Sequence, residues 1–195
     1  LEAVAKDSSQ YTLLKNGLVA LVLSLFIFTP AIFKKLKKLD GKGWLKLLVI
    51  GLIGGSIPFL LFFKGLSLTS SVSAAFFHKT LFIWVAILAW PLLKEKVKGL
   101  QLVALGVLFL GLLVFNGFGE LRFGSAELLV FLATMMWAVE SVIAKIFLKN
   151  LDSILVAWGR MFFGSLVLAA FLFLTGNTSG LFNLGFSQMG WLLLA

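Results

Sequence analysis

The chain of 195 residues is 61% hydrophobic and carries a net charge of +9. Its apolar residues recur in blocks of about twenty, the length that crosses a hydrocarbon core, so the composition indicates an all-α, multi-pass membrane protein and excludes an ordinary soluble domain. The basic residues lie mainly in short segments between the blocks, which argues against a nucleic-acid-binding surface, and the absence of cysteine excludes disulfides and thiolate metal sites.

Six complete membrane spans and the start of a seventh are predicted from these blocks. Basic segments follow the first, third and fifth spans, at residues 34–46, 94–98 and 145–152, and the positive-inside rule places them in the cytoplasm. The polar turn at residues 66–73 and the loop at residues 117–127, whose acidic residues balance one arginine, are predicted outside. The predicted spans cover residues 11–33, 44–63, 70–96, 99–118, 126–148 and 155–175, and the seventh block begins at Trp191.

The first two spans follow an opening segment, residues 1–10, that is polar and predicted to be an exposed loop. In the second span, Gly51 and Gly55 lie one helical turn apart and would let another helix approach closely. Pro58 removes a backbone donor and can open the helix near the middle of the membrane. Two interpretations stay open, a tight packing face with a mild kink and a broken helix that lines a transport path.

The third span carries His78 and Lys79 near its middle, among aromatic and aliphatic residues. Ionisable side chains inside a membrane are costly, and such positions are candidates for function. Lys15 lies nearer the outer end of the first span. If these cations share a cavity, it favours a carboxylate or phosphate group; if each reaches the lipid headgroups, they say nothing about a substrate.

The fifth and sixth spans each carry one charge, Glu140 and Arg160, at a similar distance from the cytoplasmic end. The two spans are consecutive and antiparallel, so these side chains can meet as an ion pair that holds the helices together. Alternatively, either group exchanges its partner for a proton or a substrate during transport. Trp137 lies one turn before Glu140 and could form a stacking wall for a substrate or simply pack in the core.

An internal repeat is indicated by two weak similarities at nearly the same offset. Lys15 pairs with Arg160 at an offset of 145 residues, and Trp44 pairs with Trp191 at an offset of 147. Five spans separate the paired elements, so the second copy would have inverted topology. Inverted repeats of this kind place the substrate site near the midplane, at the repeat interface.

Two stretches of the chain resemble the EamA repeats of the drug/metabolite transporter superfamily. Residues 65–115 resemble the end of the first repeat, and residues 124–169 resemble the start of the second. The features that carry the resemblance are the Ser/Thr-rich turn, Glu95, Gln101, Gly106, Gly111, the pair Trp137-Ala138 and Arg160.

This resemblance implies a fold of ten spans in two inverted halves of five, which carries small metabolites by alternating access. Residues 1–118 would then form a first repeat without its first span, and residues 119–195 a second repeat that stops at the start of its third span. Many members carry a proline near the position of Phe82, where this chain has none. Substrate preferences of proline-bearing members therefore do not carry over.

The favoured function is a secondary transporter, a permease or exporter in the cell membrane, with a small-molecule substrate and no cofactor or metal. Proton coupling or exchange and the oligomeric state stay open. The alternatives are a membrane-embedded enzyme that uses His78 and a structural membrane subunit. The candidate substrate-binding residues are His78, Lys79, Trp137, Glu140, Arg160 and Lys15.

Overall fold

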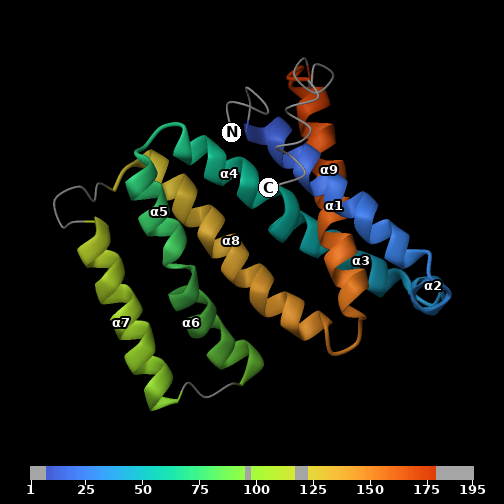
Figure 1. Cartoon of the computed structure of the whole chain (residues 1–195), viewed down its shortest axis with the longest axis horizontal. Helices are drawn as coiled ribbons and strands as arrows, with labels where there is room; N and C mark the ends of the chain where they lie inside the picture. Colours follow the sequence, from blue (N-terminus) through green and yellow to red (C-terminus); the bar gives the residue numbers. More distant parts are fainter. Residues whose placement is uncertain (1–7, 95–97, 117–122, 179–195) are drawn as a thin grey trace. The chain divides into compact units, whose positions relative to one another are not determined.

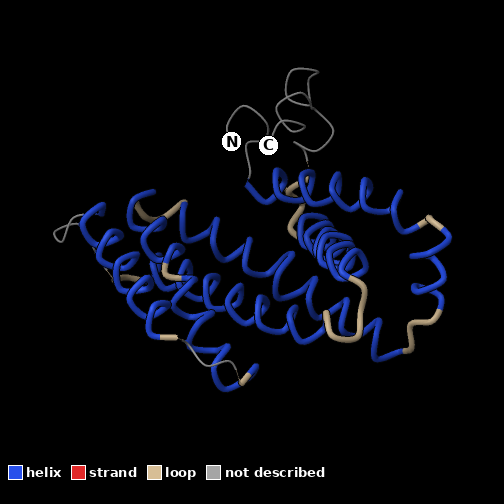
Figure 2. The backbone as a smooth tube through the Cα atoms, turned by 60° about the horizontal axis from the view of Figure 1, so that its bottom comes forward, coloured by secondary structure: helices blue, strands red, loops and turns tan. Residues whose placement is uncertain are grey.

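The computed structural model describes residues 8–94, 98–116 and 123–178, and these residues form only helices and loops (Figure 2). Five helical segments in this part of the chain are long and apolar enough to cross a membrane, and a shorter apolar helix covers Gly99–Val114. The prediction of a multi-pass helical membrane protein is confirmed. In chain order (Figure 1) the elements are α1 (Ser8–Ile27), α2 (Pro30–Lys37), α3 (Gly41–Ile50), the π-helical segment η1 (Gly51–Ser56), α4 (Ile57–Leu66), α5 (Ser71–Lys79), α6 (Leu81–Leu93), α7 (Gly99–Asn116), α8 (Ser125–Phe147) and α9 (Ser153–Leu174).

The first span is shorter than predicted at its inner end. Helix α1 begins at Ser8, within the predicted loop, and ends at Ile27 rather than near residue 33. The backbone of Thr29 is extended because the residue before a proline avoids the helical region, and Pro30 then starts α2 at its first position. Several lysines predicted in a loop therefore lie on this second, short helix.

The second span is helical from Gly41 to Leu66, and the prediction of a span over residues 44–63 is confirmed. Asp40 caps its start by accepting a hydrogen bond from the backbone N–H of Gly43 at 2.8 Å. Between α3 and α4 the helix widens into η1 without breaking, which favours the first of the two interpretations, a packing face with a local distortion, over a broken helix.

The third span differs from the predicted continuous helix because it is interrupted at Thr80, between α5 and α6. The hydroxyl of Thr80 donates to the backbone oxygen of Phe77 at 2.6 Å and accepts from Nε1 of Trp84 at 3.1 Å. Such local side-chain bonds compete with the helical ladder. His78 and Lys79 consequently lie in the last turn of α5, where the partial negative charge of a helix C-terminus favours cations.

The remaining described helices match their predictions closely. Helix α7 starts at the predicted residue, and α8 and α9 lie within one or two residues of the predicted fifth and sixth spans. The seventh apolar block, including Trp191, lies outside the described residues, as do Glu95 and residues 117–122.

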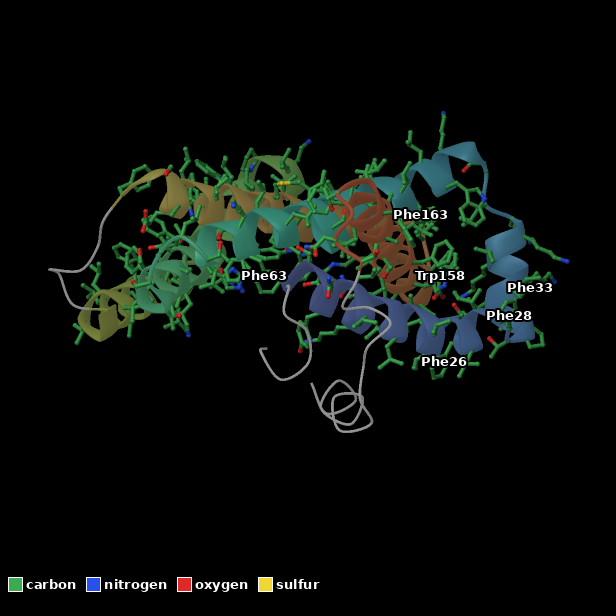
Figure 3. All side chains as sticks on the ribbon, turned by 90° about the horizontal axis from the view of Figure 1, so that it is seen from above. Phe26, Phe28, Phe33, Phe63, Trp158 and Phe163 are labelled. Atoms are coloured by element: carbon green, nitrogen blue, oxygen red, sulfur yellow. The ribbon has the colours of Figure 1, made fainter. Side chains whose placement is uncertain are left out.

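The described residues divide into two compact units, the first within Leu1–Phe59 and Phe147–Ala195 and the second within Leu60–Ile146. In the first unit α1 packs along α9, and α3 and η1 also contact α9 (Figure 1). Nε1 of Trp158 on α9 donates to the hydroxyl of Ser24 on α1 at 2.9 Å. Figure 3 labels Trp158 and Phe163, two aromatic side chains of α9 with ring centroids 6.3 Å apart. The buried core of this unit is formed by Ile27, Ile32, Leu47, Leu155 and Trp158.

The second unit contains the end of α4 together with α5, α6, α7 and α8. The end of α4 lies tightly against the start of α8, since a Cβ atom at Gly65 would come within 2.7 Å of the backbone oxygen of Ala126 and within 2.7 Å of the Cγ2 atom of Val130. Helix α5 packs on α7 and on α6.

Candidate functional site

His78 lies in an aromatic cluster of the second unit, formed by one side chain each from α4, α5 and α8. Its ring centroid is 5.2 Å from that of Phe62 and 5.0 Å from that of Trp137, both in edge-on geometry, and Phe62 and Trp137 are 5.7 Å apart. Nδ1 of His78 is buried and has no hydrogen-bond partner among the described residues. Two of the predicted site residues, His78 and Trp137, are therefore brought into contact.

Lys79, the next residue, lies in a different environment. Its side chain is exposed and lines a cavity of about 450 Å³ between α5, α6 and α7, which we call the Lys79 groove. The groove is lined by Lys79, Phe82, Val107, Leu108, Gly111 and Leu112. The lining of the groove thus combines one charged ammonium group with residues that are otherwise apolar.

Glu140 is 7% exposed and lies on the same face of α8 as Trp137, as predicted from their spacing. It belongs to the second unit, whereas Arg160 belongs to the first. An ion pair between the two residues stays a prediction, and so does their part in binding a substrate.

Arg160 contacts the backbone of the π-helical segment. Its guanidinium donates to the backbone oxygen of Gly54 at 3.4 Å. In a regular helix that oxygen would accept a bond from the N–H of residue 58, but Pro58 has no N–H. One role of the cation is therefore to donate a hydrogen bond to a backbone carbonyl of the widened turn, a role that the sequence did not indicate.

Asn16 on α1 makes a similar contact that sequence reasoning also missed. Its Nδ2 donates to the backbone oxygen of Gly55 at 3.1 Å, and the asparagine is 4% exposed. The hydroxyl of Ser56 lies within hydrogen-bonding distance of the backbone oxygens of Gly51 and Leu52, at 3.1 and 3.2 Å. Side chains from three helices thus satisfy the carbonyl groups of the distorted turn, as a membrane environment requires.

Lys15 belongs to the first unit and is half-buried on α1. Its ammonium lies 6.0 Å from the ring centroid of Tyr11, one turn earlier on the same helix. This contact is a weak cation–π interaction. A role of Lys15 in a substrate site stays a prediction.

Glu127 was predicted in an outside loop but is buried in the first turn of α8, at 6% exposure. It accepts hydrogen bonds from the hydroxyls of Thr69 and Ser73 and from the backbone N–H of Gly124, the last at 3.0 Å. A glutamate three residues after the cap of a helix is half of a capping box, so the spacing of Gly124 and Glu127 could have revealed its position. Through these hydrogen bonds the carboxylate connects the α4–α5 turn and the start of α5 to the first turn of α8.

Metal binding has no support in the described ranges 8–94, 98–116 and 123–178, where no group of three histidine, aspartate or glutamate residues could hold an ion.

Comparison with known proteins connects this geometry to a family of membrane proteins. A model of the EamA-like transporter family matches residues 3–117 and 124–195. The uncharacterized transporter YyaM of Bacillus subtilis (strain 168) is 26% identical over 177 residues, which cover 88% of this chain and 57% of that protein. The chain therefore spans little more than half the length of this relative. No solved structure matches the chain.

Proposed function

The chain belongs to the EamA-like transporter family, and on this premise we propose that it acts as a secondary transporter that moves a small metabolite by alternating access. The matched segments cover nearly all of the sequence, and the relative in Bacillus subtilis is likewise described as a transporter. We propose further that residues 1–118 and 119–195 correspond to two inverted repeats, the plan that the resemblance implies.

The proposal that the substrate site lies at the third span rests on two ionisable side chains placed at the break within that span. His78 packs edge-on against two aromatic rings, and Lys79 lines a cavity one residue later. Ionisable side chains inside a membrane span are costly, and such positions are candidates for function. Interrupted spans with polar groups at the interruption are typical of transporter substrate sites. The contact between Trp137 and His78 supports including both in that site, and Glu140, Arg160 and Lys15 stay in the proposal as charges available to it.

The proposed orientation places the basic loops in the cytoplasm and the protein in the cell membrane. Lys35 lies on α2, within the basic segment 34–46, and its ammonium contacts the carboxylate of Asp152, at the end of the segment 145–152, at 2.6 Å. This ion pair supports placing both loops on one side of the membrane. The excess of lysines in them supports the cytoplasmic side.

Transport by the purified full-length protein in proteoliposomes tests the proposal. Amino acids, organic anions and cationic compounds would be screened with and without an imposed pH gradient. We expect saturable flux of one class, lost in Lys79→Ala and kept in Lys64→Ala, which removes an exposed lysine near the end of α4.

The absence of saturable flux for every class, from a folded sample, would contradict the transporter proposal. Chemical conversion of a compound without net flux would favour the membrane-embedded enzyme that uses His78. Flux that depends on the pH gradient would support coupling to, or exchange with, protons.

A further inference from the structure

The Lys79 groove is large enough to bind a small ligand and is lined by one charged and several apolar residues. Its volume of about 450 Å³ lies in the range of small-ligand pockets. It lies entirely within the second unit, between the break that follows α5 and the middle of α7. Gly111 contributes no side chain to it, and a Cβ atom at this position would meet nothing within 4 Å.

The charge of the groove indicates an anionic ligand. The ammonium of Lys79 has no hydrogen-bond, ion-pair or ring partner in the described part of the chain, and the nearest ionisable neighbour in sequence, His78, brings no negative charge. The exposed ammonium of Lys79 is accessible to an anion, and the apolar side chains of the groove lower the dielectric on one side of it, which strengthens the interaction relative to bulk water. A carboxylate placed there would pair with the charge of the lysine.

The remaining lining residues restrict the rest of the ligand. Phe82, Val107, Leu108 and Leu112 offer apolar surface, and Lys79 supplies the polar side chain of the lining. The ammonium group of an amino acid and the hydroxyls of a sugar would be desolvated there without hydrogen-bonding partners, at a cost of several kcal/mol. A cationic compound would also be repelled by Lys79.

We propose that the Lys79 groove binds a water-soluble monocarboxylate with an aromatic or branched aliphatic body, its carboxylate on Lys79 and its body against α7. This inference rests on the proposed transporter function and narrows its substrate to that chemical class. The apolar lining of the groove and the ammonium of Lys79 distinguish this class from zwitterions, sugars and cations.

Binding of matched ligands to the full-length protein tests the inference. Phenylacetate and its neutral isostere phenylacetamide would be compared by equilibrium dialysis in nanodiscs made of zwitterionic lipid alone, with phenylalanine as the zwitterion. We expect phenylacetate to bind at least about tenfold more tightly than either of the others, the usual effect of one charge-assisted hydrogen bond.

Substitutions in and near the groove separate the contribution of the Lys79 charge to ligand binding from that of the apolar space beside α7. Lys79→Gln should remove the preference for phenylacetate over phenylacetamide, and Lys79→Arg should keep it. Gly111→Leu should fill the groove and weaken both ligands, whereas Gly106→Leu, on the same helix with equally open space at its Cβ and outside the groove lining, should weaken neither. Equal affinity of the two ligands, no effect of Lys79→Gln, or equal effects of the two glycine substitutions would overturn the proposal.

An anionic lipid is the competing source of a negative charge for Lys79. The sequence has no cysteine, so Val107→Cys would report on the groove, with Leu110→Cys as an equally exposed control outside its lining, at 63% and 62% exposure. Phenylacetate should slow maleimide labelling of the first cysteine only. Slowing by phosphatidylglycerol nanodiscs without phenylacetate would assign the groove to lipid and overturn the proposal.

The outcomes for the groove and for the transporter are separable. Flux of another chemical class, without phenylacetate binding, would overturn the inference and leave the proposed function in place. If phenylacetate binds at the groove but no compound shows flux, the inferred binding site would be supported and the proposed transporter function contradicted.

Discussion

Glu127 illustrates at the scale of a single residue how a charge can be buried at the end of a membrane span. Its carboxylate accepts hydrogen bonds from two hydroxyls and one backbone N–H, so its lone pairs are used within the protein. Hydrogen bonds to an ionised acceptor are stronger than those between neutral groups. The residue therefore stabilises the junction of the α4–α5 turn with α8.

Glu127→Ala should lower the free energy of unfolding by about 1–3 kcal/mol, because Gly124, Thr69 and Ser73 lose their acceptor in a buried position. Thermal unfolding in detergent would measure the loss. Gln101→Ala is the matched control, since Gln101 accepts one backbone N–H bond at the exposed start of α7. Equal losses in the two variants would contradict a special role for Glu127.

The pair formed by Lys35 and Asp152 makes stability depend on pH. The ammonium of Lys35 and the backbone N–H groups at the start of α9 hold the pKa of Asp152 below its ordinary value. The folded protein keeps this carboxylate ionised at pH values where the unfolded chain begins to protonate it. Its contribution is thus complete above the usual pKa of an aspartate and is lost as the pH falls through the lowered pKa.

Unfolding of Asp152→Asn, measured from pH 7 down to pH 3, should show a weaker loss of stability on acidification than the unmodified protein. The asparagine keeps the N-cap bond to Ile154 but not the ion pair with the exposed Lys35. At neutral pH the variant should lose about 0.2–1 kcal/mol, as for other surface pairs. If the free energy of unfolding falls as steeply with pH in the variant as in the unmodified protein, carboxyl groups other than Asp152 determine the pH dependence of stability.

The π-helical segment η1 is the element that shapes the first unit. Gly51 and Gly55 face α9 so closely that a Cβ atom at Gly55 would overlap the backbone oxygen of Arg160. Asn16 and Arg160 donate hydrogen bonds to backbone oxygens of the same turn. Both the close approach and the widened turn depend on glycines followed by Pro58, and π-helical turns of this kind often mark functional sites.

Gly55→Ala should destabilise the protein by about 1–3 kcal/mol, since the added methyl group forces the backbones of η1 and α9 apart. Gly106→Ala is the matched control, because its Cβ would meet open space and alanine favours a helix. Thermal unfolding of both variants in the same detergent would measure the difference. A Gly55→Ala protein as stable as the control would contradict the tight packing of η1 on α9.

At the scale of the whole molecule, the predicted topology puts the two ends of the second span on opposite sides of the membrane. Lys38→Cys and Ser67→Cys place single labels beside these ends, both at exposed positions. In intact cells that make the full-length protein, a membrane-impermeant maleimide should modify the cysteine at position 67 and spare the one at position 38. The reverse pattern would show that the basic loops face outward.

The helices could be predicted from the sequence because membrane insertion is a local requirement. A span must be apolar over about twenty residues and must satisfy its own backbone, so hydropathy and loop charge locate the helices. The resemblance to the EamA repeats, carried by small and charged positions, is confirmed by the family match. His78 and Lys79 could be selected as candidates because an ionisable side chain within an apolar span is rare and costly, which is visible in the sequence alone.

The tertiary structure alone decided which partner each polar group meets. The backbone oxygens of the widened turn receive hydrogen bonds from Asn16 and Arg160, on helices distant in sequence, and Ser24 on α1 accepts one from Trp158 on α9. Neither the hydropathy nor the charge of a segment contains these contacts. A buried polar group takes whatever donor or acceptor a neighbouring helix brings within about 3 Å, so its role is set by packing rather than by local composition.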